Sequence, residues 1–254
     1  MRNVSEAYKE TMKQLIRPMT LFRGELEITD VKLRNEATVT STAKADFSTN
    51  DVLADIHEYD YIALEPNFMR VGSNQQIIKP ETDNYLSNGY VSSEMSNSNG
   101  AFTTYPVITI TFPKRELLGL SYQFVCDYPS VISVKTYLDN AVVQEYTSYP
   151  DSLNYTDPTK LEVCDKIVLT FKAMNAVNRR LRVARIIFGL VHKFDNSTLM
   201  KSEHISFVDP VSSSLSYKKL KIQLINFNKE FNPDNPSGIW RYFENNQPIN
   251  IYYG

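Results

Sequence analysis

Apolar and polar positions alternate along the central part of the chain. Ile108, Ile110 and Phe112 fall on one face of an extended segment, and the residues between them fall on the other. The same period of two predicts strands at 107–112, 119–126, 131–138, 142–147, 163–171 and 181–191. Asp139-Asn140 marks a tight hairpin. Six short strands of this kind indicate a mainly β fold, an antiparallel jelly-roll-like sandwich.

Near the N-terminus, apolar residues recur with the period of a helix rather than that of a strand. Apolar residues recur at helical spacing over 3–17, which predicts an amphipathic helix that ends before Pro18. The helix either packs on its own domain or is an arm that docks onto a neighbouring subunit. The apolar stripe of this assembly helix is Val4, Tyr8, Met12 and Leu15.

The remaining segments are less regular. Residues 20–40 predict two strands, Phe22–Ile28 and Val31–Val39, and 44–105 is mostly loop with short strands near 61–64 and 68–71. A loop this long indicates function or an interface. Residues 193–211 are polar and precede further strands at 213–227 and 248–253, so they predict a boundary. The expected parts are therefore an arm over 1–43, the sandwich over 44–195, and the start of a second β domain over 196–254.

Composition narrows the function classes. The chain has 254 residues, of which 42% are hydrophobic, so it can bury a core. Its formal net charge of −2 does not favour nonspecific electrostatic binding to nucleic acid. No apolar run is long enough for a membrane span, and the N-terminus lacks the apolar core of a signal peptide, so we expect synthesis in the cytoplasm.

No constellation for catalysis is visible. His57, His192 and His204 have no partners at metal-ligand spacing, and glycine-rich phosphate loops and nucleophile elbows are missing. We therefore predict no enzymatic activity, catalytic residue, metal or cofactor. Scattered carboxylates leave a glycosidase open, because their separation cannot be read from a sequence.

Two cysteines and a basic run favour structural roles. Cys126 and Cys164 are expected to be buried thiols on strands, with a disulfide possible only if those strands are neighbours. Arg180, Arg182 or Arg185 is expected on a solvent face, where it balances nearby Asp and Glu residues, with an anion or phosphate site as the alternative.

Tyrosine and asparagine side chains flank the predicted loops. Tyrosines can stack on the apolar faces of sugars, and asparagines can hydrogen-bond to hydroxyls. The alternative is that the tyrosines are interface or core residues. The candidate glycan- or partner-binding residues are Tyr90, Asn97, Asn99, Tyr105, Tyr149 and Tyr155.

Four segments, in order, resemble tail proteins of phages and prophages of Gram-positive bacteria. They are Met1–Arg17, Tyr61–Asn67 (YIALEPN), Tyr90–Phe112 and Val208–Tyr242. The resemblance implies a galactose-binding-like β-sandwich in the middle and the opening of a baseplate-type domain at the end.

The same resemblance implies a non-catalytic structural and host-adhesion component of a tail tip, a baseplate or a phage-tail-like particle. It implies other tail or baseplate proteins as partners and assembly into the virion. A bacterial cell-surface glycan is expected as a further partner because of the tyrosine and asparagine side chains at the loops, and a homo-oligomer in the particle because of the apolar stripe of the predicted N-terminal helix. The alternatives are a carbohydrate-binding module for surface glycans and, less favoured, a glycan-degrading enzyme.

Overall fold

The computed structural model describes residues 22–45, 48, 51–53, 89–207, 217–226, 228–236, 238–245 and 247–253. The chain divides into two compact units. Unit 1 combines residues 1–26, 192–241 and 248–254, and unit 2 combines residues 27–191 and 242–247. The predicted helix at 3–17 and the predicted strands at 61–64 and 68–71 lie outside the described residues.

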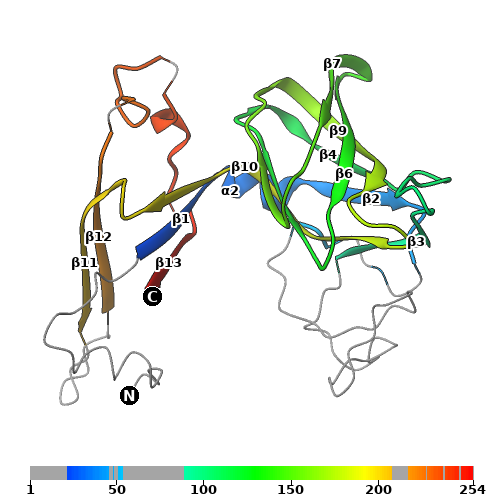
Figure 1. Cartoon of the computed structure of the whole chain (residues 1–254). Coiled ribbons are helices and arrows are strands. Elements are labelled where there is room, and N and C mark those ends of the chain that lie inside the picture. Colours follow the sequence, from blue (N-terminus) through cyan, green and yellow to red (C-terminus); the bar gives the residue numbers. More distant parts are fainter. Residues whose placement is uncertain are drawn as a thin grey trace, which may run out of the picture. The chain divides into compact units, whose positions relative to one another are not determined.

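Unit 2 is an antiparallel β-sandwich, which confirms the predicted fold class. One sheet has the strand order β2-β4-β9-β6-β7 (Figure 1). Its strands are β2 (Thr38–Thr42), β4 (Val107–Leu117), β6 (Pro129–Leu138), β7 (Ala141–Ser148) and β9 (Leu161–Met174). In the other sheet, β10 pairs with β1, β3 and β5, and β5 pairs with β8. These strands are β1 (Phe22–Thr29), β3 (Tyr90–Met95), β5 (Leu120–Phe124), β8 (Asn154–Asp157) and β10 (Arg180–Asp195). Residues 22–26 of β1 and 192–195 of β10 belong to unit 1, so both strands continue across the division between the units.

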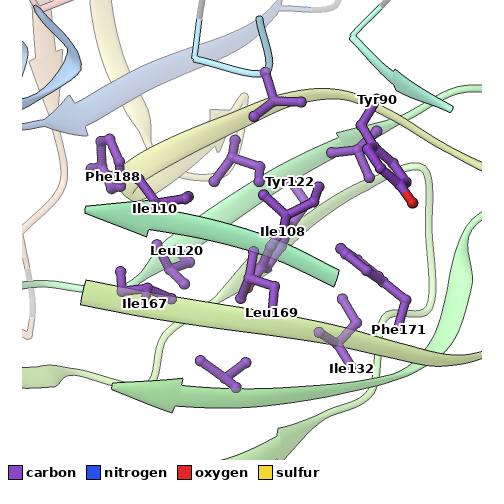
Figure 2. Packing of buried hydrophobic residues seen from close by; sticks show 14 of the residues in the cluster. Tyr90, Ile108, Ile110, Leu120, Tyr122, Ile132, Ile167, Leu169, Phe171 and Phe188 are labelled. Atoms are coloured by element: carbon purple, nitrogen blue, oxygen red, sulfur yellow. The ribbon is translucent and has the colours of Figure 1, made fainter. Parts of the chain in front are cut away.

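The core lies between the two sheets of unit 2. The register places Ile108 beside Leu169 and Ile110 beside Ile167, so the apolar residues predicted for β4 share one face of the sheet with those of β9. All four side chains are fully buried. Figure 2 shows them packed with Tyr122 and other residues of the facing sheet. Period-two alternation thus identifies the inward positions correctly.

The segment after β1 corrects one prediction. Val31–Glu36 forms the short helix α2, not the start of a strand. Asp30 caps this helix, because its Oδ1 accepts a hydrogen bond from the Leu33 amide at 2.9 Å. Arg115 holds the same carboxylate at 2.6 Å through Oδ2. The alternation of Val31 and Leu33 resembles a strand, but the capping residue determines the local structure.

Three strands were not predicted. β3 (Tyr90–Met95) lies inside the predicted loop at 44–105, β8 has only four residues, and β11 (Leu199–Phe207) lies inside the predicted boundary at 193–211. That stretch is therefore largely regular, and the division between the units falls between Val191 and His192. The predicted hairpin at Asp139-Asn140 is confirmed, because both residues have positive φ angles, 50° and 69°.

Unit 1 contains two strand pairs. β13 (Ile249–Tyr253) pairs antiparallel with residues Phe22–Leu26 of β1. β11 pairs antiparallel with β12 (Tyr217–Leu224) in a two-stranded ribbon (Figure 1). Trp240–Tyr242 forms a short 3-10 helix.

The two cysteines differ in their surroundings. Cys164 on β9 is buried, as predicted, and burial raises the pKa of its thiol to about 12, so the thiol stays protonated at neutral pH. Cys126 lies in the loop after β5 and is exposed, so the prediction of a buried thiol is wrong there. The two residues are not joined in a disulfide.

Candidate functional site

Four loops of unit 2 gather at one end of the sandwich, which we call the loop end. They are 96–106, 125–128, 149–153 and 175–179. Antiparallel pairing requires this arrangement, because neighbouring strands begin or finish at the same level. The pairs nearest this end are Val107 with Thr170, Pro129 with Met174, Ile132 with Ser148, and Met95 with Arg180.

Backbone hydrogen bonds join three of these loops. The Ser96 amide donates to the Arg179 carbonyl at 2.8 Å, and the Asn178 amide donates to the Ser96 carbonyl at 3.1 Å. The Asn175 amide donates to the Tyr128 carbonyl at 2.9 Å. Loops tied in this way present their side chains on a preorganised platform, which lowers the entropic cost of binding a ligand.

Apolar and aromatic side chains protrude from the loop end. Two of the predicted residues are among them: Tyr149 is 66% exposed and Tyr105 is 47% exposed. Sequence reasoning missed the other three, which are Met95, Leu153 and Val177. The one available signal was a single apolar residue within a polar turn, as at Val177 in Asn-Ala-Val-Asn. Exposed apolar side chains gathered on loops indicate an interaction surface.

Asn97 and Asn99 lie in the turn that follows β3. The Asn97 Oδ1 accepts hydrogen bonds from the Asn99 amide at 2.8 Å and the Ala101 amide at 3.1 Å. Gly100 completes the turn with φ +80°, and a Cβ there would lie 2.9 Å from the Met174 carbonyl. Both asparagine side chains are exposed, and the Asn97 Oδ1 stabilises the turn through its two hydrogen bonds. The Asn97 amide nitrogen and the Asn99 amide group make no hydrogen bond to other described residues, so both are open to solvent.

Tyr90 does not belong to this surface, so its prediction as a sugar-binding residue is wrong. Its side chain is fully buried (Figure 2). The hydroxyl donates a hydrogen bond to the Thr42 carbonyl at 2.8 Å, with the Ala43 carbonyl 3.0 Å away. Burial raises the pKa of Tyr90. The residue starts β3 opposite Val183, inside the sandwich, so no ring face is open to a sugar.

Tyr155 supports the loop end from within. It is half-buried, and its ring stacks on Tyr122 with centroids 6.4 Å apart. The Ser148 hydroxyl lies 3.4 Å from the Tyr155 hydroxyl. Tyr155 and Ser148 flank the 149–153 loop on either side, so this contact holds the base of the loop that carries Tyr149.

The arginine run has internal partners. Arg182 and Arg185 are buried, so their prediction as solvent-facing residues is wrong. Arg185 forms a two-pronged ion pair with Glu27, and Arg180 donates to the carbonyls of Ser92 and Ser93. Because these guanidinium groups bind partners within unit 2, the run is used for structure.

Histidine and acidic side chains do not assemble a metal centre in the described part of the chain, where no three His, Cys, Asp or Glu residues converge. His192 packs its ring against Phe194 and Phe231, with centroids 6.5 and 5.2 Å away. His57 lies outside the described residues. No helix among the described residues is both long and apolar enough to cross a membrane.

Comparisons with known proteins give distant structural likenesses. No family model and no curated protein matches the chain. The family 32 carbohydrate-binding module of C. perfringens NanJ, solved with galactose, is 12% identical with a TM-score of 0.37, covering 64% of this chain and 96% of the module. Chitosan-binding module 1 from a Paenibacillus sp. IK-5 chitosanase/glucanase is 10% identical with a TM-score of 0.35, covering 62% and 95%. Likenesses this distant do not identify a ligand for this chain.

Proposed function

We propose that unit 2 is a non-catalytic binding module whose loop end recognises a bacterial cell-surface glycan. The observation that carries the proposal is the exposure of Tyr149 and Tyr105 on loops whose bases are fixed. A sugar ring has an apolar C–H face and polar edges, and an exposed tyrosine beside amide groups matches both. Asn97 and Asn99 supply such amides close to Tyr105 in the sequence.

The width of the loop end favours an extended ligand. The 96–106 loop leads into β4 and the 149–153 loop leaves β7, and these strands lie three positions apart in one sheet. At ~4.8 Å per strand, the two loops start roughly 14 Å apart. A ligand that contacts both loops therefore spans several sugar units, as a surface polysaccharide does.

Replacing Tyr149 with alanine is expected to weaken glycan binding about tenfold, or 1–2 kcal/mol, because it removes one aromatic anchor. Tyr105→Ala is expected to have a similar effect. A glycan array identifies the ligand, and titration calorimetry measures each variant. Val142→Ala is the matched control, because Val142 is 53% exposed at the opposite end of the sandwich.

Three outcomes would count against this proposal. Equal binding by Tyr149→Ala, Tyr105→Ala and wild type would remove the loop end as the site. Absence of binding to any array glycan or to purified cell walls would remove glycan recognition. Release of sugars from the cell walls by the wild-type protein would show catalysis instead of binding.

We further propose that the chain acts within a phage tail tip, a baseplate or a phage-tail-like particle. Unit 1 favours a role in assembly. Its β11-β12 ribbon exposes 70% of Met200 and 41% of Ile205, and a two-stranded ribbon is only marginally stable in water without a partner. Contacts with other tail proteins or with further copies of the chain would cover such side chains in a particle.

Deletion of residues 1–18 is expected to abolish self-association or binding to a neighbouring tail protein while unit 2 stays folded. The physical reason is the apolar stripe at Val4, Tyr8, Met12 and Leu15, which must pack on something. Sedimentation velocity measures association, and circular dichroism checks the fold. Normal association, or loss of the fold, would show that residues 1–18 are dispensable for assembly or belong to the core.

A further inference from the structure

One face of the β11-β12 ribbon in unit 1 carries an excess of positive charge. Cross-strand partners in a ribbon share a face, and every second residue of a strand returns to the same face. The register therefore gathers six side chains on what we call the lysine face: Lys201, Glu203, Ile205, Lys219, Lys221 and Gln223. Five of the six are exposed, and Glu203 is half-buried. Three lysines against one glutamate leave this face with a formal charge of +2.

The lysine face has few counterions of its own. Glu203 approaches Lys201 only to 4.0 Å, and neither Lys219 nor Lys221 forms an ion pair with another described residue. Ile205, which lies beside Lys219, is 41% exposed. Ammonium groups next to an exposed apolar side chain are complementary to a partner that presents carboxylates among apolar residues.

Residues 54–69 have this complementary chemistry in their sequence. The segment, which lies outside the described residues, contains no lysine or arginine and four carboxylates: Asp55, Glu58, Asp60 and Glu65. Tyrosine and isoleucine stand among the carboxylates in the sequence DIHEYDYI over 55–62. Its formal charge of −4 is thus opposite to that of the lysine face, and we call it the acidic segment.

The acidic segment belongs to a long connection whose two ends are fixed on unit 2. Val52 is fully buried, and its carbonyl accepts a hydrogen bond from the Ile186 amide at 2.6 Å. Tyr90, at the other end, is fully buried too. The 35 residues over 54–88 join these anchors, and a connection of that length can reach up to roughly 50 Å outward. The segment is therefore long enough to contact a neighbouring molecule.

We propose that the lysine face of one copy of this chain binds the acidic segment of a second copy. The inference rests on the proposed role in a tail or tail-like particle, and it names a second copy as the partner that covers the ribbon. Because the two surfaces differ, the contact is heterologous, and its repetition builds a ring or a filament.

Sedimentation velocity of the full chain tests the contact. The variant Lys201→Gln/Lys219→Gln/Lys221→Gln is expected to weaken self-association about tenfold or more, because it removes the positive charge of the lysine face. Raising the salt concentration from ~0.1 M to ~1 M is expected to weaken wild-type association to a similar extent, because the Debye length falls from about 10 Å to about 3 Å.

A control variant removes the same number of lysines from unit 2. Lys114→Gln/Lys135→Gln/Lys160→Gln changes side chains that are 54%, 39% and 50% exposed, so it matches the first variant in charge and in exposure to solvent. It is expected to associate as the wild type does. Circular dichroism checks that each variant keeps the fold.

Mixing two variants tests whether the contact joins different surfaces of two copies. Asp55→Asn/Glu58→Gln/Asp60→Asn removes three charges of the acidic segment and keeps the lysine face, whereas the lysine-face variant keeps the acidic segment. Each variant alone is expected to stay monomeric at concentrations where the wild type associates. Their equimolar mixture is expected to form one-to-one complexes and nothing larger, because only one productive contact remains.

Four outcomes would overturn the contact: a monomeric wild type, a lysine-face variant that associates as strongly as the wild type, equal loss in the control, or a mixture that stays monomeric. None of these removes the role in a particle, which is tested separately. Immunoelectron microscopy of the phage or tail-like particles locates the chain, and its absence from them would remove that role.

Discussion

Replacing Glu27 with glutamine is expected to destabilise the protein by about 3–5 kcal/mol, because it leaves the Arg185 guanidinium buried without its carboxylate. The pair is two-pronged, with Nη1 2.8 Å from Oε1 and Nη2 3.0 Å from Oε2. The two side chains are only 10% and 5% exposed, so water cannot replace the lost partner. Urea denaturation followed by circular dichroism measures the free energy of unfolding of each variant.

Glu25→Gln is the matched control for this change. Glu25 lies two residues earlier on β1 and pairs with Arg23; the Glu25 side chain is 16% exposed and the Arg23 side chain is 57% exposed. Because the Arg23 end of this pair is open to water, the pair contributes at most about 1 kcal/mol, and the control variant should lose little stability. Replacing Glu27 and Arg185 together with methionine removes both charges and should recover much of the loss. If Glu27→Gln costs no more than Glu25→Gln, the pair does not support the sandwich.

The strands of the sandwich could largely be predicted from the sequence, because half-buried strands carry their apolar residues at every second position. β4 and β9 show this clearly, since Ile108, Ile110, Ile167 and Leu169 all face inward as expected. Short polar strands carry no such signal. β8 has only one aromatic residue in four, and its pairing with β5 comes from the fold around it.

The candidate site could be predicted only in part. Tyr90 and Tyr149 both stand beside polar, loop-forming residues in the sequence, yet one is fully buried and the other is 66% exposed. What separates them is the pairing of Tyr90 with Val183, a residue 93 positions away. The local pattern correctly identifies tyrosines that flank loops. Which of them are exposed depends on strand pairing between residues far apart in the sequence, and this cannot be read from the local pattern.

The arginine run shows that the burial of a charged residue is also hard to predict from the local sequence. Arg182 and Arg185 stand in a basic stretch, which favoured a solvent-facing interpretation. Arg185 instead meets Glu27, which is 158 residues away on β1, and the pair is buried where β1 lies beside β10. An acidic partner so distant in sequence cannot be inferred from local spacing.

Gly189 lies on β10 beside the same part of β1, and Gly189→Ala is expected to cost roughly 3 kcal/mol or more of stability. Two effects add. The φ angle of Gly189 is +143°, a conformation that L-residues rarely adopt. A Cβ there would also lie 2.0 Å from the Ile28 carbonyl oxygen, so β1 would have to move. The Asp30 amide, which donates to the Phe188 carbonyl at 3.2 Å, would move with it.

Urea denaturation again measures the loss, and Glu162→Ala on an exposed position of β9 is the control, expected within about 0.5 kcal/mol of wild type. The close approach of Ile28 explains why glycine stands in the middle of a 16-residue strand, where it would otherwise weaken the strand. If Gly189→Ala unfolds at the same urea concentration as the control, β1 does not approach β10 this closely, and the buried contact between Glu27 and Arg185 is in doubt as well.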